Sequence, residues 1–125
     1  DPLCHHKKGE WVASFEDCQK LVGNSDLTHY VSGTFPASMW KLGLTIPSAE
    51  FEGPYCFVYV DMDTEQATHD AIEFFWPRMV SGGKMVIDDY DWEPCAGVKK
   101  AVDERFTEKQ RTVVQGLHTC IVEKK

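Results

Sequence analysis

The stretch of sequence that decides the fold spans residues 57–90, FVYVDMDTEQATHDAIEFFWPRMVSGGKMVIDDY. It holds most of one apolar run, residues 55–60, and all of a second, residues 84–87, and a pair of acids follows each run. Both runs are continuously apolar and rich in β-branched and aromatic residues, which is typical of parallel strands buried on both faces. Between them, residues 65–80 repeat apolar side chains at spacings of three and four, which predicts a helix. The predicted unit is strand, helix, strand.

The paired acids are Asp61 with Asp63 and Asp88 with Asp89. Ligands of such sheets bind at the carboxyl ends of parallel strands, so we expect the four carboxylates to converge there. Three oxygen donors, completed by water and two substrate hydroxyls, suit Mg²⁺, and Asp61, Asp88 and Asp89 fit that role. Asp63 is then an outer-shell group or a base. The alternative is that each Asp merely caps the helix after it.

Other elements follow on either side of this unit. Ser14 is a good N-cap for a helix over residues 15–22, which Gly23 ends. Further predicted elements are a strand over residues 29–35, a helical turn over 37–42, a loop over 43–54, a helix over 96–106, and an antiparallel pair of strands over 112–115 and 118–122. The predicted order is α, β, α-turn, β, α, β, α, β, β.

Composition narrows the class of protein. The 125 residues, 42% of them hydrophobic, suit one domain. Thirteen basic and twenty acidic residues give a net charge of −7 without a basic stripe, which argues against a nucleic-acid partner. No signal peptide is present, and no apolar run reaches the length of about 20 residues that a membrane span needs. The first residue is Asp1 rather than Met, which suggests trimming or a fragment.

The cysteines indicate the redox compartment. There are five, an odd number, without CxxC spacing, and they are Cys4, Cys18, Cys56, Cys95 and Cys120. We therefore expect a reducing, cytoplasmic setting. The segment Cys4-His5-His6 has soft metal ligands, but neighbouring positions cannot all point at one ion, so we interpret it as a loop.

Several motifs together carry a family resemblance. They are VDMD at residues 60–63, DAIEF at 70–74, WPRMV at 76–80, GG at 82–83, DDY at 88–90 and GVKKAVD at 97–103, with HKKG at 6–9 and SGTFP at 32–36 upstream. The chain resembles the macrocin O-methyltransferase family over most of its length. That resemblance implies a class I methyltransferase that uses S-adenosylmethionine, and in several members Mg²⁺ or another divalent cation, to methylate sugar or phenolic hydroxyls.

The resemblance also implies a Rossmann-like α/β sheet with strand order 3-2-1-4-5-7-6. The strands predicted here correspond to the third to seventh, mostly parallel with a C-terminal antiparallel hairpin, so residues 1–125 are expected to form a partial, truncated domain. The first two strands are absent, and with them the Gly-rich turn for the cofactor. The edge at residues 55–61 must then be covered by a second copy in a homodimer, by the strand at 29–35, or by an N-terminal segment removed from this chain.

The resemblance assigns further site residues. Ser32 and Gly33 are expected beside the cofactor's adenine, with Asp61 as a third cofactor contact, although Gly33 also fits a strand that simply ends there. Asp63 and His69 are candidate bases; the alternative for His69 is a solvent-facing helix position. Tyr90 and Trp92 are expected to roof a small-molecule hydroxyl acceptor, and the simpler alternative for Tyr90 is that it anchors the loop.

Three functions stay open at this point. The first is an S-adenosylmethionine-dependent, metal-assisted O-methyltransferase whose cofactor half is missing, so that catalysis by this chain alone is doubtful. The second is a non-catalytic module whose exposed sheet edge dimerises or binds a protein. The third is a small domain that binds a metal or another ligand through its four carboxylates.

Overall fold

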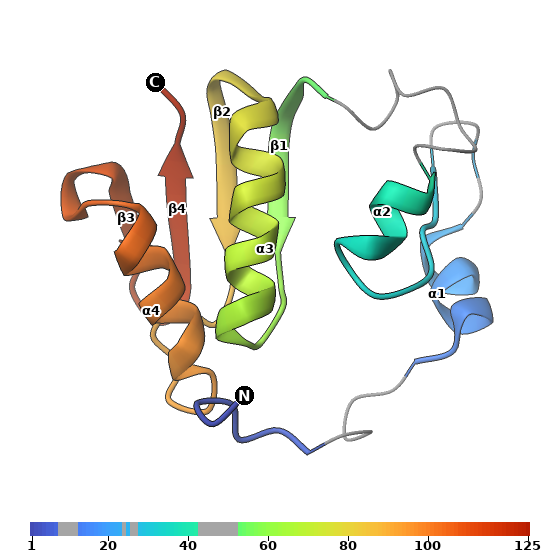
Figure 1. Cartoon of the computed structure of the whole chain (residues 1–125), viewed down its shortest axis with the longest axis horizontal. Coiled ribbons are helices and arrows are strands. Elements are labelled where there is room, and N and C mark those ends of the chain that lie inside the picture. Colours follow the sequence, from blue (N-terminus) through green and yellow to red (C-terminus); the bar gives the residue numbers. More distant parts are fainter. Residues whose placement is uncertain (8–12, 24, 26–27, 43–52) are drawn as a thin grey trace.

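The structure is a computed structural model that describes residues 1–7, 13–23, 25, 28–42 and 53–125. Its elements in chain order are α1 (Phe15–Val22), α2 (Ala37–Leu42), β1 (Tyr55–Val60), α3 (Glu65–Phe75), the 3₁₀ helix η2 (Trp76–Arg78), β2 (Met79–Ile87), α4 (Ala96–Arg105), the 3₁₀ helix η3 (Glu108–Gln110), β3 (Arg111–Val114) and β4 (Thr119–Glu123) (Figure 1). Among these helices, none has the length and apolar character needed to cross a membrane. The chain is a mixed α/β protein.

The predicted strand, helix, strand unit is confirmed. β1 and β2 are parallel neighbours, with Val58 opposite Met85 and Val60 opposite Ile87, and α3 connects them. Because the strands are parallel and in this register, their carboxyl ends lie side by side. This is the edge at which the sequence places the paired acids.

The helix between the strands is shorter than residues 65–80. α3 ends at Phe75, a 3₁₀ turn that contains Pro77 follows, and β2 begins at Met79 instead of residue 84. Proline has no backbone N–H to continue the α-helical pattern, which explains the early end. Met79 then pairs with Tyr55, and the register shifts before Lys84 pairs with Phe57.

The C-terminal hairpin is also confirmed, with each boundary shifted by one residue. β3 and β4 are antiparallel, β4 is also antiparallel to β2, and the order across the sheet is β1-β2-β4-β3. Gly116 takes a φ of +79° in the turn, where glycine meets no steric penalty. β1 and β2 are thus the parallel part of the sheet, and β4 and β3 are its antiparallel part.

The two long helices, α3 and α4, cover one face of the sheet, and the core lies between this face and the helices (Figure 1). Its buried side chains include Val58 and Val60 of β1, Met85 and Ile87 of β2, Cys120 and Val122 of β4, Ala71 and Ile72 of α3, and Val98 and Val102 of α4. The expectation that β1 is buried on both faces is wrong. Phe57 and Tyr59, on its opposite face, are 58% and 54% exposed, because α3 and α4 both pack on the other side.

The strand predicted over residues 29–35 is absent. Residues 29–32 have no regular structure, and a bend and a turn follow at residues 33–35. β1 is therefore an edge strand of the described sheet, and it does not pair directly with this segment. Gly33 takes a φ of +134°, and the N–H of Ser38 bonds to the carbonyl of Thr34, so the backbone turns into α2. Phe35 attaches this segment to α3 by ring contacts with Phe74 and Phe75, at centroid distances of 5.5 and 5.6 Å.

The helix predicted over residues 15–22 has those boundaries. Its N-cap is Ser14, whose hydroxyl oxygen accepts a hydrogen bond of 3.1 Å from the N–H of Asp17. None of its residues is buried, and the helix lies away from the sheet (Figure 1). The predicted loop at residues 43–54 falls mostly outside the described residues.

Candidate functional site

Asp61 and Asp88 follow the adjacent ends of β1 and β2. The backbone N–H of Asp88 donates a hydrogen bond of 2.9 Å to the carbonyl of Val60, which ties the two strand ends together immediately before Asp61. Asp61 is exposed, and Asp88 is half-buried. The predicted convergence of acids from two strands at one sheet edge is therefore present.

Asp63 and Asp89 complete the group, and we call the four residues Asp61, Asp63, Asp88 and Asp89 the acidic cluster. Asp63 and Asp89 both have left-handed backbone conformations, with φ of +57° and +56°. Aspartate tolerates this region better than most residues but rarely occupies it. The two tight turns direct the chain away from the strands, and Asp63 and Asp89 share a side-chain hydrogen bond.

The electrostatics of the acidic cluster are unfavourable when all four carboxylates are charged. Burial, the charge of Asp88, and the hydrogen bond and charge of Asp63 raise the pKa of Asp89 to about 6. Burial, then the charges of Asp63 and Asp88, raise the pKa of Asp61. Among the described residues, no Lys or Arg forms an ion pair with any of the four carboxylates. A bound cation would supply the missing positive charge.

Two hydroxyl groups lie at Asp88. Tyr59 donates a hydrogen bond of 2.5 Å to Oδ2. The hydroxyl of Thr119 lies 3.2 Å from Oδ1 and 2.8 Å from the carbonyl of Leu117, and its one hydrogen serves one of these acceptors at a time. Tyr59 projects from the exposed face of β1, and Thr119 begins β4. Sequence reasoning missed both residues. The position of Tyr59, two residues before Asp61 in a strand, was a usable signal, because alternate residues share a face.

Cys95 is a third residue that sequence reasoning did not place in the site. It is fully buried at the start of α4, and one ligand atom from each of Asp63, Asp89 and Cys95 lies within 4.8 Å of the others. Burial first, and then the charges of Asp89 and Asp63, raise the pKa of the Cys95 thiol to about 12. This tight group shares only Asp89 with the predicted ligand set of Asp61, Asp88 and Asp89, which stays a prediction.

His69 lies between two helices. Its Nε2 is 3.1 Å from Oε2 of Glu104 on α4, and Glu65, His69 and Glu104 form a second group whose ligand atoms lie within 4.8 Å of one another. Glu65 is already paired with Lys100, whose Nζ is 2.6 Å from Oε1. The role of His69 as a base stays a prediction, and its ring is engaged with Glu104.

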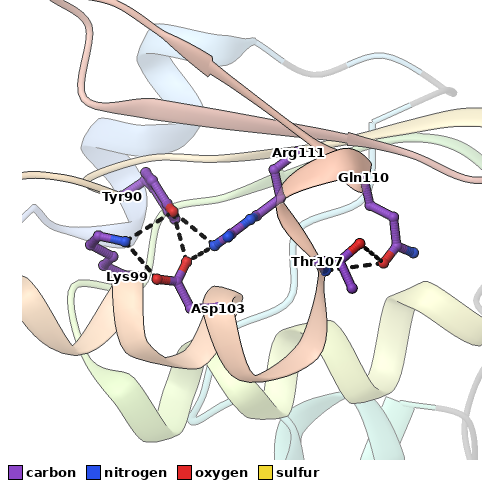
Figure 2. A network of polar contacts seen from close by, with 6 residues as sticks. All are labelled: Tyr90, Lys99, Asp103, Thr107, Gln110 and Arg111. Atoms are coloured by element: carbon purple, nitrogen blue, oxygen red, sulfur yellow. Dashed lines mark hydrogen bonds and ion pairs between the residues drawn. The ribbon is translucent and has the colours of Figure 1, made fainter.

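Tyr90 belongs to the loop that follows β2, and its side chain is buried. Its hydroxyl donates a hydrogen bond of 2.7 Å to Asp103, and accepts hydrogen bonds from Lys99 at 3.1 Å and Arg111 at 2.8 Å. Asp103 also forms ion pairs with Lys99 and Arg111, so four side chains from the loop, α4 and β3 form one network (Figure 2). Tyr90 anchors the loop, and 5% of its surface remains for an acceptor to touch.

Trp92, on the same loop, is half-buried. Its backbone N–H lies 3.3 Å from the carbonyl of Asp89, and its ring centroid lies 5.6 Å from that of His6. Trp92 also packs against the hydrophobic core, and its contact with an acceptor stays a prediction.

Ser32 and Gly33 are both exposed. Phe35, two residues beyond Gly33, packs at the C-terminal end of α3, whereas Asp61 and Asp63 precede the N-terminal end of that helix. The described contacts therefore attach this segment at the end of α3 that is farther from the acidic cluster. Its assignment to a cofactor pocket stays a prediction.

The chain has a likeness among solved structures, and none among protein-family models or curated sequences. No protein-family model matches the chain, and no curated protein sequence matches it. Among solved structures, the chain is similar to one titled "Structure of the O-methyltransferase NovP", with 22% sequence identity and a TM-score of 0.49. The match covers 56% of this chain and 29% of that one.

Proposed function

We propose that this chain carries the cation- and acceptor-binding part of an O-methyltransferase that acts on a sugar or phenolic hydroxyl. The observation that carries the proposal is the acidic cluster, in which four carboxylates without a basic partner among the described residues meet at the ends of two parallel strands. The motif resemblance supports the choice of chemistry, because it assigns metal ligands to the same strand ends.

The residues of the acidic cluster fit a hard divalent cation. Mg²⁺ prefers oxygen ligands and keeps several water molecules, and Asp61, Asp88 and Asp89 supply oxygens from two adjacent strand ends. Burial first, and then the charges of Asp88 and Asp63, raise the pKa of Asp89, and a nearby cation would lower it again. Tyr59 and Thr119 contact Asp88, as partners of a ligating carboxylate commonly do.

Asp61, Asp88 and Asp89 would hold the cation, which would supply polarisation of an acceptor hydroxyl and so lower the pKa of that hydroxyl. Asp63 would then accept the released proton, because it lies beside Asp89 and is not one of the proposed ligands. Trp92 borders the site from the loop after β2 and offers a ring face to a sugar or phenol. The hydrogen bond from Tyr59 fixes the position of one proposed ligand, Asp88.

The described residues do not fit the methyl donor. S-adenosylmethionine is the donor that the resemblance implies, but the sequence has no GxGxG-like turn, and Gly33 is attached near the far end of α3. We therefore assign to the chain the binding and orientation of the acceptor alone.

Calorimetric titration with MgCl₂ tests the cation site. We expect the parent chain to bind one Mg²⁺, and Asp88→Asn to lose at least about tenfold in affinity, because it replaces a charged carboxylate ligand by a neutral amide, which binds Mg²⁺ less well. Asp70→Asn is the matched control, since Asp70 is a half-buried carboxylate on α3 that bonds to Gln66 outside the cluster. Equal affinity of Asp88→Asn and the parent would refute the proposal.

One observation favours a second candidate, a non-catalytic module that dimerises through its sheet edge. β1 is an edge strand of the described sheet, and Phe57 and Tyr59 are more than half exposed on it. An exposed apolar edge is prone to pair with another chain. Light scattering on Phe57→Lys distinguishes the two: a parent dimer that this change dissociates, together with no Mg²⁺ binding, would favour the module over the enzyme.

A further inference from the structure

The N-terminal segment, residues 1–7, lies against the start of α3 and the loop before α4. Oδ2 of Asp1 accepts a hydrogen bond of 2.7 Å from the N–H of Glu65, and the N–H of His5 donates one of 2.9 Å to the carbonyl of Pro94. These contacts hold the segment beside the acidic cluster (Figure 1).

Cys4 and Cys95 face each other across this contact as an antiparallel β-bridge. The hydrogen bond from His5 to Pro94 flanks the bridge, so Cys4 and Cys95 form a non-hydrogen-bonded pair. In such pairs the Cα atoms lie about 4.5 Å apart and the side chains are closest. That separation falls within the window of about 4.4–6.8 Å that a disulfide requires.

We propose that Cys4 and Cys95 form an intramolecular disulfide that fastens the N-terminal segment to the loop before α4. The other cysteines are placed differently: Cys18 is exposed on α1, Cys56 is exposed on β1, and Cys120 is buried in β4. Among the described residues, the Cys4–Cys95 bridge is the one backbone pairing that sets two cysteines opposite each other.

A small-molecule disulfide, such as oxidised glutathione, is the oxidant. Cys4 is partly exposed, so its thiolate attacks one glutathione sulfur, the S–S bond breaks, and one glutathione leaves as a thiolate. The Cys95 sulfur then attacks Sγ of Cys4 and displaces the second glutathione. The two cysteines lose two electrons and two protons, and the two glutathione molecules leave as thiols.

The link affects the neighbouring cluster. The Cys95 sulfur lies within 4.8 Å of carboxylate oxygens of Asp63 and Asp89, and a sulfur held in a disulfide cannot ionise to a thiolate ligand. Oxidation therefore removes Cys95 as an alternative ligand beside the proposed set of Asp61, Asp88 and Asp89, a consequence that rests on the proposed function. Formation of the disulfide itself does not rest on it.

The test is to equilibrate the chain with reduced and oxidised glutathione, block the remaining thiols with N-ethylmaleimide, and map the digest by mass spectrometry. We expect one crosslink that joins the peptides of Cys4 and Cys95, and alkylated Cys18 and Cys56. The crosslink closes a long loop, so the midpoint of thermal unfolding should rise by at least about 5 °C.

Two variants make the result decisive. Cys4→Ser should abolish both the crosslink and the rise of the midpoint, and Cys56→Ser, which removes another accessible cysteine, should retain both. The proposal is overturned if Cys95 stays a free thiol in the oxidised parent, whether Cys4 is then alkylated, paired with Cys18, or left as a mixed disulfide with glutathione.

Discussion

The hydroxyl of Tyr59 donates a hydrogen bond of 2.5 Å to Oδ2 of Asp88 and thereby joins the exposed face of β1 to the carboxyl end of β2. This hydrogen bond is the largest of the effects that raise the pKa of Tyr59 to about 12, followed by burial and the charges of nearby aspartates. Tyr59 therefore remains a donor at all physiological pH values and fixes the orientation of the Asp88 carboxylate.

Replacing Tyr59 with Phe removes this donor and leaves the strand intact. We expect the affinity for Mg²⁺ to fall by about tenfold, because partners of metal ligands commonly contribute that much. Calorimetry at pH 7 measures the change. Tyr55→Phe, on the same strand, is the control and should bind as the parent does; a Tyr59→Phe variant with unchanged affinity would show that Asp88 needs no such support.

The acidic cluster makes stability depend on pH when no cation is present. The pKa of Asp89 is about 6 in the folded chain and about 3.9 in an unfolded one, so between these values the folded state binds more protons. The free energy of unfolding should therefore fall as pH rises from about 4 to 6. Urea denaturation at several pH values in this range measures the fall in the free energy of unfolding, which should be smaller in Asp89→Asn. The same dependence on pH in the variant and the parent would contradict the raised pKa of Asp89.

The network around Tyr90 stabilises the loop after β2. Asp103→Ala leaves Arg111, whose side chain is 9% exposed, without its ion pair, and leaves the Tyr90 hydroxyl without its acceptor. We expect a loss of about 2–3 kcal/mol in the free energy of unfolding by denaturant. Asp91→Ala, which removes an exposed partner of His118, should cost less than about 0.5 kcal/mol. Equal losses of stability in Asp103→Ala and Asp91→Ala would show that burial of the network around Tyr90 adds no stability.

Gly97 allows α4 to approach the start of α3. A Cβ atom at this position would lie 2.9 Å from both the backbone N and the Cβ of Glu65, closer than real contacts allow. Gly97→Ala should lower the free energy of unfolding by about 1–3 kcal/mol, because the two helix ends must separate. Ala96→Ser, at the exposed neighbouring position, should be close to neutral in the same denaturation experiment.

Local patterns predicted most of the described fold. The strand at residues 55–60, the helix starts at Glu65 and Ala96, and the C-terminal hairpin follow from apolar spacing and from turn residues that act within a few positions. The misplaced helix end at Phe75 also has a local cause, because Pro77 stands inside a continuous apolar pattern. A helix that is predicted to end just before Pro77 agrees with the structure.

Other features depend on contacts that sequence patterns do not carry. A strand over residues 29–35 needs a neighbour, and β1 does not pair with this segment in the described structure. The exposure of Phe57 follows from helices that cover only one face, which an apolar run cannot reveal. In the site, the meeting of paired acids was predictable from parallel strands, whereas the arrival of Cys95 and Thr119 depends on how α4 and β4 pack.

The most direct measurement is an anomalous difference map from crystals of the chain soaked in MnCl₂, since Mn²⁺ takes the oxygen ligands that Mg²⁺ takes and scatters anomalously. We expect one strong peak at the carboxyl ends of β1 and β2, within about 2.3 Å of oxygens of Asp61, Asp88 and Asp89. No peak there, or a peak only at the Glu65, His69 and Glu104 group, would contradict a cation site in the acidic cluster.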